Sequence, residues 1–322
     1  MRRRTKRMGG RRTTIYIIVV GLLLAAHYIY DNFAPEVVVA AEPSEEVMPI
    51  EDPSAEAAPR KTTGTQWAEL PAMKRQSDDI YITSHHSGEM RNYTVCYSSE
   101  HHAPLWVAAP RHRAYTGDVK RVDNYDFDPT LPVNIQTRLN RSYGDYTRGH
   151  MLGSAERTAT THMNNQTFYV TNIAPQLRDG FNERGGAWNN LEYFVDRQVC
   201  ADTLYVVTGA IYERFTDSDG TTIEPRTTKN KNDGKQIGVP TAYYKVLLRT
   251  KSGRTGRSVR ECSASELKCA AFIVGHRSAS GRKPSAEDMI PVRELERMTG
   301  IDFFAAVPNA PEKEANAADW GL

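Results

Sequence analysis

The segment 145–151 carries the side chains best suited to chemistry. Arg148 and His150 stand two residues apart, with Gly149 between them. Residues two apart on an extended strand share a face, so the guanidinium and the imidazole would point the same way. A neutral imidazole can take a proton from water, and a guanidinium can bind two phosphate oxygens at once. The pair therefore suits phosphodiester hydrolysis, although an isolated histidine of this kind is more often a structural residue.

A second segment supplies groups that could hold a metal ion. A loop over residues 177–186 contains Asn182, and the helix expected after it bears Glu192. An amide oxygen, together with water molecules, suits Mg²⁺, which keeps much of its hydration shell. The order of strand, loop and helix can bring His150, Asn182 and Glu192 to a common point.

Short apolar runs bounded by turn residues surround these segments, and such runs are typical of strands. The runs expected to form strands are residues 93–97, 105–108, 168–170, 204–207, 242–248 and 269–274. Apolar residues at helical spacing predict a helix over 187–199, and a second helix over 292–299 is expected to end at Gly300. Strands with interspersed helices predict an α+β domain.

Taken in order, several blocks of this sequence resemble the DNA/RNA non-specific endonuclease family, which includes secreted bacterial sugar-non-specific nucleases and mitochondrial endonuclease G. The blocks are residues 145–151, 168–176, 207–213, 239–246 and 295–304. Together they cover about residues 93–308, nearly all of the globular part. The resemblance implies a ββα-metal nuclease fold, in which a central, mostly antiparallel sheet is flanked by helices.

The resemblance also implies a role for individual residues. His150 falls on the general base, and Arg148 falls on the arginine that contacts phosphate. Glu192 falls on the carboxylate that holds metal-bound waters, and Arg121 on the arginine that stabilises the transition state. The implied activity is metal-dependent hydrolysis of DNA and RNA with little sequence preference, with Mg²⁺ as cofactor and Mn²⁺ or another divalent cation as the alternatives.

The sequence departs from the family's pattern at the first residue of its motif. The family has Asp there, and this chain has Thr147. A threonine hydroxyl could reproduce part of a turn hydrogen bond made by that Asp, and Asp145 could compensate.

A second departure concerns the metal ligand. The family's asparagine lies four residues before the tryptophan, and that place here is Arg184, which cannot bind a cation. We infer a two-residue insertion around residues 183–186, which leaves Asn182 as the metal ligand. Asn189 and Asn190 are the alternatives.

The beginning of the chain has the order of an export signal or a membrane anchor. Basic residues precede an apolar run over 15–30, and this run is shorter than the ~20 residues that span a bilayer comfortably. We expect residues 1–13 in the cytoplasm, 14–30 as a membrane anchor or a cleaved signal, and a periplasmic or extracellular catalytic domain, secreted if cleavage occurs. Both alternatives stay open.

The next segment, residues 31–75, is acidic and rich in proline and offers little apolar surface, so we expect a disordered linker. The endonuclease domain is then expected over 76–322. The whole chain has a net charge of only +2, and this value neither supports nor excludes a nucleic-acid partner. Four cysteines without a CxxC pair argue against a zinc ribbon, and a disulfide between Cys262 and Cys269 stays open.

Other candidate residues have simpler interpretations. The pairs His85-His86 and His101-His102 are adjacent, so on a strand their side chains point to opposite faces and cannot chelate one ion. Trp106 and Trp188 are expected in the core rather than as base-stacking platforms. The stretch 229–235 is expected to be a solvated loop, with a backbone-binding edge as the alternative.

Two other functions remain open at this level. The first is a catalytically silent nucleic-acid-binding module at the cell surface, which Thr147 and the displaced asparagine would explain. The second is a metal-dependent phosphodiesterase for smaller substrates, which would use the same residues. The expected partners are DNA and RNA, with membrane contact through the N-terminal helix. Whether the chain forms a homodimer, as several members of the family do, is open.

Overall fold

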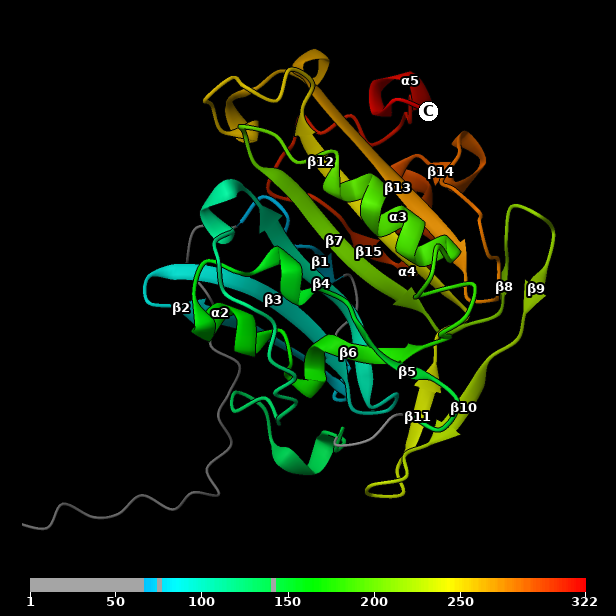
Figure 1. The fold of residues 1–322 in the computed structure, drawn as a ribbon. Coiled ribbons are helices and arrows are strands. Elements are labelled where there is room, and N and C mark those ends of the chain that lie inside the picture. The colour runs from blue at the N-terminus through cyan, green and yellow to red at the C-terminus, as the bar shows by residue number, and fades with distance from the viewer. Residues whose placement is uncertain (1–66, 74–76, 140–142) are drawn as a thin grey trace, which may run out of the picture. The chain divides into compact units, whose positions relative to one another are not determined.

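A computed structural model describes residues 67–73, 77–139 and 143–322, and an antiparallel sheet runs through the middle of them (Figure 1). Within these residues the sheet has seven strands in the order β14-β13-β12-β7-β4-β3-β2. Their bounds are β2 Ile80–Ser87, β3 Met90–Ser98, β4 Ala103–Arg111, β7 Leu204–Ile211, β12 Ala242–Thr250, β13 Leu267–Gly275 and β14 Met289–Ile290. Every neighbouring pair is antiparallel. The predicted α+β fold with a mostly antiparallel sheet is confirmed.

Alternation along the strands divides the core between the two faces of the sheet. In β12, Tyr243 and Leu247 belong to one buried cluster, whereas Tyr244 and Val246 belong to the other. Because successive side chains of a strand point to opposite faces, both faces must be covered by other elements. Lys245 lies on the same face as Tyr243 and is buried within the otherwise apolar run at 242–248.

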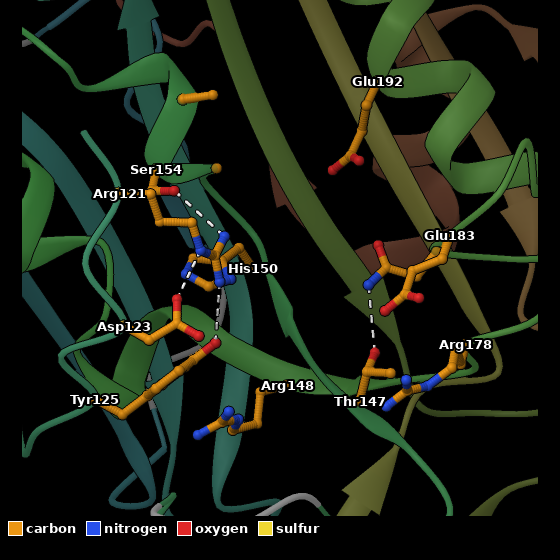
Figure 2. A pocket seen from close by; sticks show the side chains of 13 residues that line it. Arg121, Asp123, Tyr125, Thr147, Arg148, His150, Ser154, Arg178, Glu183 and Glu192 are labelled. Carbon is orange, nitrogen blue, oxygen red and sulfur yellow. Dashed lines mark hydrogen bonds and ion pairs between the residues drawn. The ribbon is translucent and has the colours of Figure 1, made fainter. Parts of the chain in front are cut away.

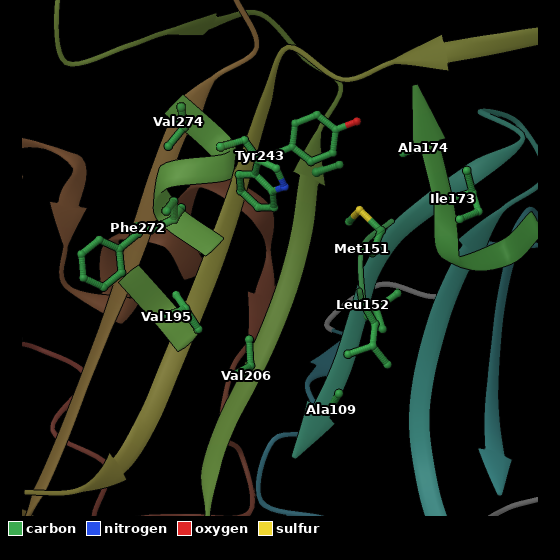
Figure 3. Packing of buried hydrophobic residues seen from close by; sticks show 14 of the residues in the cluster. Ala109, Met151, Leu152, Ile173, Ala174, Val195, Val206, Tyr243, Phe272 and Val274 are labelled. Carbon is green, nitrogen blue, oxygen red and sulfur yellow. The ribbon is translucent and has the colours of Figure 1, made fainter. Parts of the chain in front are cut away.

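The first face is covered by α3 (Ala187–Asp196), which lies across β12 and β13 in Figure 1. Its buried side chains recur at helical spacing and include Trp188, Leu191, Phe194 and Val195. Phe194 packs against Phe272 of β13, with ring centroids 5.2 Å apart. Figure 3 shows Val195 and Phe272 on one side of this cluster and Met151 and Leu152 on the other. The helix ends three residues before the predicted 199.

The second face is covered by α4 (Val292–Thr299) and the residues after it. The helix ends at Gly300, as predicted, where φ is +69° and glycine is the residue that adopts this conformation without strain. Phe303 and Phe304 then return into the core. The short helix α5 (Ala317–Trp320) contributes Trp320 to the cluster on the first face.

Two short strands beside the sheet carry the predicted motif. They are β5 (Thr147–His150) and β6 (Ile173–Gln176), and they pair antiparallel. The helix α2 (Thr161–Gln166) lies between them in sequence. The strand predicted at 168–170 is wrong, because these residues form a turn that leads into a 3₁₀ helix at Val170–Asn172. The apolar run indicated burial rather than a strand, and β6 begins only at Ile173.

Smaller ribbons complete the described part. They are β1 (Ala72–Met73) with β15 (Ile301–Asp302), β8 (Phe215–Thr216) with β9 (Thr222–Ile223), and β10 (Arg226–Lys229) with β11 (Gln236–Val239). Residues 67–73, expected in the linker, therefore lie against the domain: β1 pairs with β15, and Glu69 forms a buried ion pair with Arg91. All four cysteines are free thiols, so Cys262 and Cys269 are not bonded.

Candidate active site

A cavity of ≈ 510 Å³ opens where β5, the loop after β6 and α3 meet. All five predicted site residues line it, together with several polar residues that the sequence did not single out (Figure 2). The predicted residues are Arg121, Arg148, His150, Asn182 and Glu192. The polar residues not predicted are Asp123, Tyr125, Ser154, Arg178 and Glu183.

Packing against Gln176 explains the glycine of the motif, Gly149. Burial alternates along β5, so that Arg148 and His150 are half-buried on one face while Thr147 and Gly149 are buried on the other. A Cβ on Gly149 would lie 2.2 Å from Cδ of Gln176, a distance at which atoms overlap. Glycine leaves room for the buried Gln176 side chain, which would have to shift for any larger residue, where β5 pairs with β6.

His150 presents an unpaired nitrogen at the cavity. Its ring packs edge-on against Phe168, with centroids 5.0 Å apart, and lies 5.9 Å from the ring of Tyr125. The Nε2 atom is buried and has no hydrogen-bond partner among the described residues. Burial, and then the positive charge of Arg121, lower the pKa of His150 to about 3. The imidazole is therefore neutral at physiological pH and can accept a proton.

The end of β5 is anchored directly behind His150. Met151 and Leu152 are buried in the core cluster. Leu152 N–H donates to Oδ1 of Asn172 (2.9 Å), and the Asn172 amide donates back to the Leu152 carbonyl (2.9 Å). This reciprocal pair ties the residues after His150 to the 3₁₀ turn before β6.

The two predicted arginines gather around Tyr125. Arg121 binds Asp123 (2.7 Å) and reaches the hydroxyl of Tyr125 (3.5 Å) and that of Ser154 (3.4 Å). The guanidinium of Arg148 stacks 3.8 Å above the Tyr125 ring, and its Nη1 donates to the Leu139 carbonyl. Tyr125 therefore contacts both arginines beside His150.

Glu192 faces the cavity from α3, on the other side from His150 (Figure 2). Burial raises the pKa of this carboxyl to about 7, against the opposing effect of the positive charge of Lys245. Lys245 itself lies beneath α3, where its Nζ donates to Thr208 (3.0 Å) and sits 4.9 Å from the Trp188 ring. Near neutral pH the Glu192 carboxyl is therefore partly protonated and partly ionised, and nearby charges shift that balance.

Asn182 reaches the cavity from the loop at 177–186. Its Nδ2 donates to the hydroxyl of Thr147 (3.3 Å), and that hydroxyl donates to the Gln176 carbonyl (3.1 Å). With the amide nitrogen turned to Thr147, the amide oxygen is left for another partner. The two alternatives are engaged elsewhere: Asn189 accepts from Gly185 N–H, and Asn190 donates to backbone carbonyls.

The donor set fits a divalent cation that keeps most of its water. No group of three or more His, Cys, Asp or Glu side chains that could enclose a metal occurs among the described residues. The cavity instead offers the Asn182 oxygen, with the carboxyls of Glu183 and Glu192 also lining it. Mg²⁺ is commonly bound through one or two protein oxygens and several waters, so these residues suit such an ion.

Comparison with known proteins decides the family. The model of the DNA/RNA non-specific endonuclease family matches residues 81–310. The chain belongs to this family. Membership confirms the predicted family, fold and enzyme class, and members of the family depend on a divalent metal.

Individual members of the family are similar over about two thirds of this chain. The mitochondrial nuclease EXOG of Danio rerio is 28% identical over 225 residues, which are 67% of this chain and 60% of that protein. Human mitochondrial endonuclease G is 25% identical, covering 68% of each chain. A nuclease of Nostoc is 29% identical, covering 67% of this chain and 73% of the relative.

A solved structure supports the same fold. It is the crystal structure of an EndoG/EndoGI complex, described as the mechanism of EndoG inhibition. It has a TM-score of 0.53 and 26% identity, and it covers 69% of this chain and 85% of the matched one.

The comparisons correct the predicted location. We expected a membrane-anchored endonuclease with a periplasmic or extracellular catalytic domain. That prediction is wrong, because relatives from zebrafish, human and two yeasts are named mitochondrial nucleases. The predicted segments 1–13 and 14–30 lie outside the described residues. Within the part of the chain that the structure describes, no helix is long and apolar enough to cross a membrane.

Residues missed by the sequence analysis differ in whether a signal existed. Lys245 could have been found, because it is a charge inside the apolar run at 242–248. Arg178 could have been noticed as a cation two residues after the end of β6. Tyr125 and Ser154 carry no local signal, since only the tertiary fold brings them to His150.

Proposed function

We propose that this endonuclease hydrolyses phosphodiester bonds of DNA and RNA with little sequence preference, using His150 as general base. The observation that carries the proposal is the buried Nε2 of His150, which has no partner among the described residues, at a cavity also lined by three arginines, an asparagine and two glutamates. An orphaned buried acceptor costs free energy unless a ligand or water satisfies it. The attacking water would occupy that position.

His150 would accept a proton from this water. The low pKa of its imidazole, about 3 in the substrate-free cavity, keeps the ring neutral and ready. A bound phosphate brings negative charge, and negative charge close to an imidazole favours the imidazolium form. Substrate binding would therefore raise the proton affinity of His150 when it is needed.

Arg121 and Arg148 would stabilise the negative charge that grows on the phosphate. Both guanidiniums are held by protein contacts before substrate arrives, Arg121 by Asp123 and Arg148 by Tyr125 and the Leu139 carbonyl. Preorganised charges need little rearrangement in the transition state, and this is what makes them effective.

Asn182 and Glu192 would serve a divalent cation, for which we propose Mg²⁺, with Mn²⁺ as the alternative. When bound, such an ion supplies Lewis-acid stabilisation of the phosphate and leaving-group oxygens. Asn182 would offer its amide oxygen, because Thr147 holds its nitrogen. Glu192 lies on the side of the cavity opposite His150 and, once ionised, would accept hydrogen bonds from metal-bound water.

Low sequence preference follows from what the cavity offers. Its lining is dominated by charged and polar side chains suited to phosphate and water. Phosphate contacts position a nucleic acid without reading its bases. We therefore propose both DNA and RNA as substrates. Formation of a homodimer stays a prediction, which size measurement of the full chain in solution would test.

The test is cleavage of supercoiled plasmid and of RNA by the full chain, with Mg²⁺ or with EDTA. His150→Ala should lower the rate by several orders of magnitude, whereas His86→Ala, at an exposed histidine outside the cavity, should cleave like the parent. Equal cleavage by both variants would disprove the assignment of the base. If the substrates stay intact but shift on a gel equally with and without EDTA, the catalytically silent binding module would be favoured.

A further inference from the structure

Arg178 is the cavity arginine whose guanidinium has no protein partner among the described residues. It is exposed and lines the cavity, yet its guanidinium has no hydrogen bond or ion pair among the described residues. Arg121 and Arg148 differ in this respect, since each is held by a protein oxygen and an aromatic ring. A free guanidinium at the edge of an anion-binding cavity has its full hydrogen-bonding capacity left for a ligand.

The backbone that carries Arg178 is fixed. The N–H of Leu177 donates to Nε2 of His276 (2.8 Å), and the other ring nitrogen of His276 faces the Pro240 carbonyl (2.7 Å). The carbonyl of Arg178 accepts from Glu183 N–H (3.0 Å). Only the side chain therefore has to be ordered when a ligand binds, which keeps the entropic cost of the contact low.

Arg178 stands on a different side of the cavity from the other arginines. Figure 2 shows it next to Thr147 and Glu183, away from Arg121 and His150. The cavity of ≈ 510 Å³ lies within the range of pockets that enclose a whole small ligand, and it exceeds the needs of a single phosphate. A strand whose scissile phosphate lies at His150 would thus pass close to Arg178.

We infer that Arg178 binds a phosphate of the substrate strand next to the scissile one, on the Thr147 side of the cavity. The inference rests on the proposed function and adds a second anion contact to it. Arg178 holds the strand in place and takes no part in the proton transfer at His150. Its loss should therefore weaken binding without slowing the chemical step.

Binding is measured first, so that the result does not depend on catalysis. The full chain with His150→Ala, in EDTA, is titrated into a fluorescently labelled single-stranded oligonucleotide at several salt concentrations. Arg178→Gln is added to this background, and Arg184→Gln is the matched control. Arg184 is an exposed arginine of the same loop that does not line the cavity.

The expected result is specific to Arg178. Arg178→Gln should weaken binding roughly five- to tenfold and lower the slope of log affinity against log salt by about 0.7, the value for one phosphate contact on a single strand. Arg178→Lys should keep the slope, because it keeps the charge. Arg184→Gln should change neither quantity. Identical affinity and slope for Arg178→Gln and its parent would overturn the inference.

Kinetics in the active chain separate this inference from the proposed function. Arg178→Gln should raise KM by a similar factor and leave kcat within about twofold, the pattern of a lost contact made equally in ground and transition states. An active parent with an unchanged KM in Arg178→Gln would refute the role of Arg178 alone. An inactive parent would refute the nuclease proposal, while the binding difference would still support the phosphate contact.

Discussion

Replacing Lys245 by methionine should shift the pH dependence of catalysis while leaving the fold intact. Lys245 is buried beneath α3, where its Nζ contacts the Thr208 hydroxyl and the Trp188 ring, and it forms no ion pair among the described residues. Methionine has a similar length and needs no partner. Exchanging a poorly paired buried charge for an apolar side chain is often neutral or stabilising.

The magnitude comes from the influence of Lys245 on Glu192. Burial raises the pKa of Glu192 to about 7, and Lys245 is the main group that opposes this rise. At an effective dielectric constant of ~20, a unit charge contributes about 2 kcal/mol at ~8 Å and about 1 kcal/mol at ~16 Å. One pKa unit corresponds to about 1.4 kcal/mol. Lys245→Met should therefore raise the pKa of Glu192 by about one unit.

The sign follows from the form of Glu192 that catalysis needs. An ionised carboxylate appears only as pH rises through its pKa, so activity should rise with pH through the midpoint set by Glu192. At pH 7 the ionised fraction would fall from about one half to about one tenth, and activity would fall about fivefold. At alkaline pH both proteins should cleave equally. A bound cation lowers both midpoints, so they are compared at one metal concentration.

The assay is plasmid cleavage from mildly acidic to alkaline pH, together with thermal unfolding. Lys268→Met is the matched control, because Lys268 is also buried but lies over Trp320 and binds the Asp319 carbonyl, away from the cavity. Its profile should keep the midpoint of the parent. A Lys245→Met profile that superimposes on the parent's would refute the link between Lys245 and Glu192.

Three further substitutions test packing and hydrogen bonding, two of them at the site and one elsewhere in the core. Gly149→Ala places a Cβ 2.2 Å from Gln176 Cδ, so it should destabilise the fold by about 1–3 kcal/mol in denaturant unfolding, whereas an unchanged midpoint would mean that Gln176 can move. Thr147→Val removes the hydroxyl that holds Asn182 and should raise the Mg²⁺ concentration for half-maximal rate about tenfold, with Thr147→Ser close to the parent. Asp128→Asn alters a fully buried carboxylate that binds a histidine and two threonine hydroxyls, and should cost about 1–3 kcal/mol of unfolding free energy.

The sequence predicted those parts of the fold in which pattern and burial agree. Apolar runs at 93–97, 105–108 and 204–207 all lie inside sheet strands, because a strand buried on both faces is apolar along its whole length. The same reasoning failed at 168–170, where a buried run forms a turn. An apolar run of three residues reports burial and does not by itself report conformation.

The histidine pairs show why residue type alone decides little. His85 is buried and binds Asp128 at 3.0 Å, whereas His86, its neighbour on β2, is exposed. The two neighbours differ in burial, but the pairing of β2 with β3 is irregular between them, so the prediction that their side chains point to opposite faces stays a prediction. What the sequence could not show is that Asp128, more than 40 residues away, is the partner that makes His85 structural.

The site was predictable where it is local and unpredictable where it is not. Arg148 and His150 share a face because they lie two apart on one strand, and that much follows from strand geometry. Tyr125, which lies beside both, comes from a stretch without regular structure, and neither charge nor spacing marks it. Arg178 and Glu183 enter the cavity only because the loop at 177–186 folds back toward Thr147.

The two departures from the family's pattern meet in one contact. Thr147 stands where we expect the motif's Asp, and we infer that Asn182 is the displaced asparagine. The Asn182 amide donates to the Thr147 hydroxyl, and that hydroxyl donates to the Gln176 carbonyl. An ionised carboxylate accepts hydrogen bonds and donates none. At position 147 it could hold Asn182 but would face the Gln176 carbonyl without a proton between them. A hydroxyl, which both accepts and donates, satisfies the longer loop and the strand together. The Thr147 hydroxyl is therefore compatible with the insertion that we infer around residues 183–186.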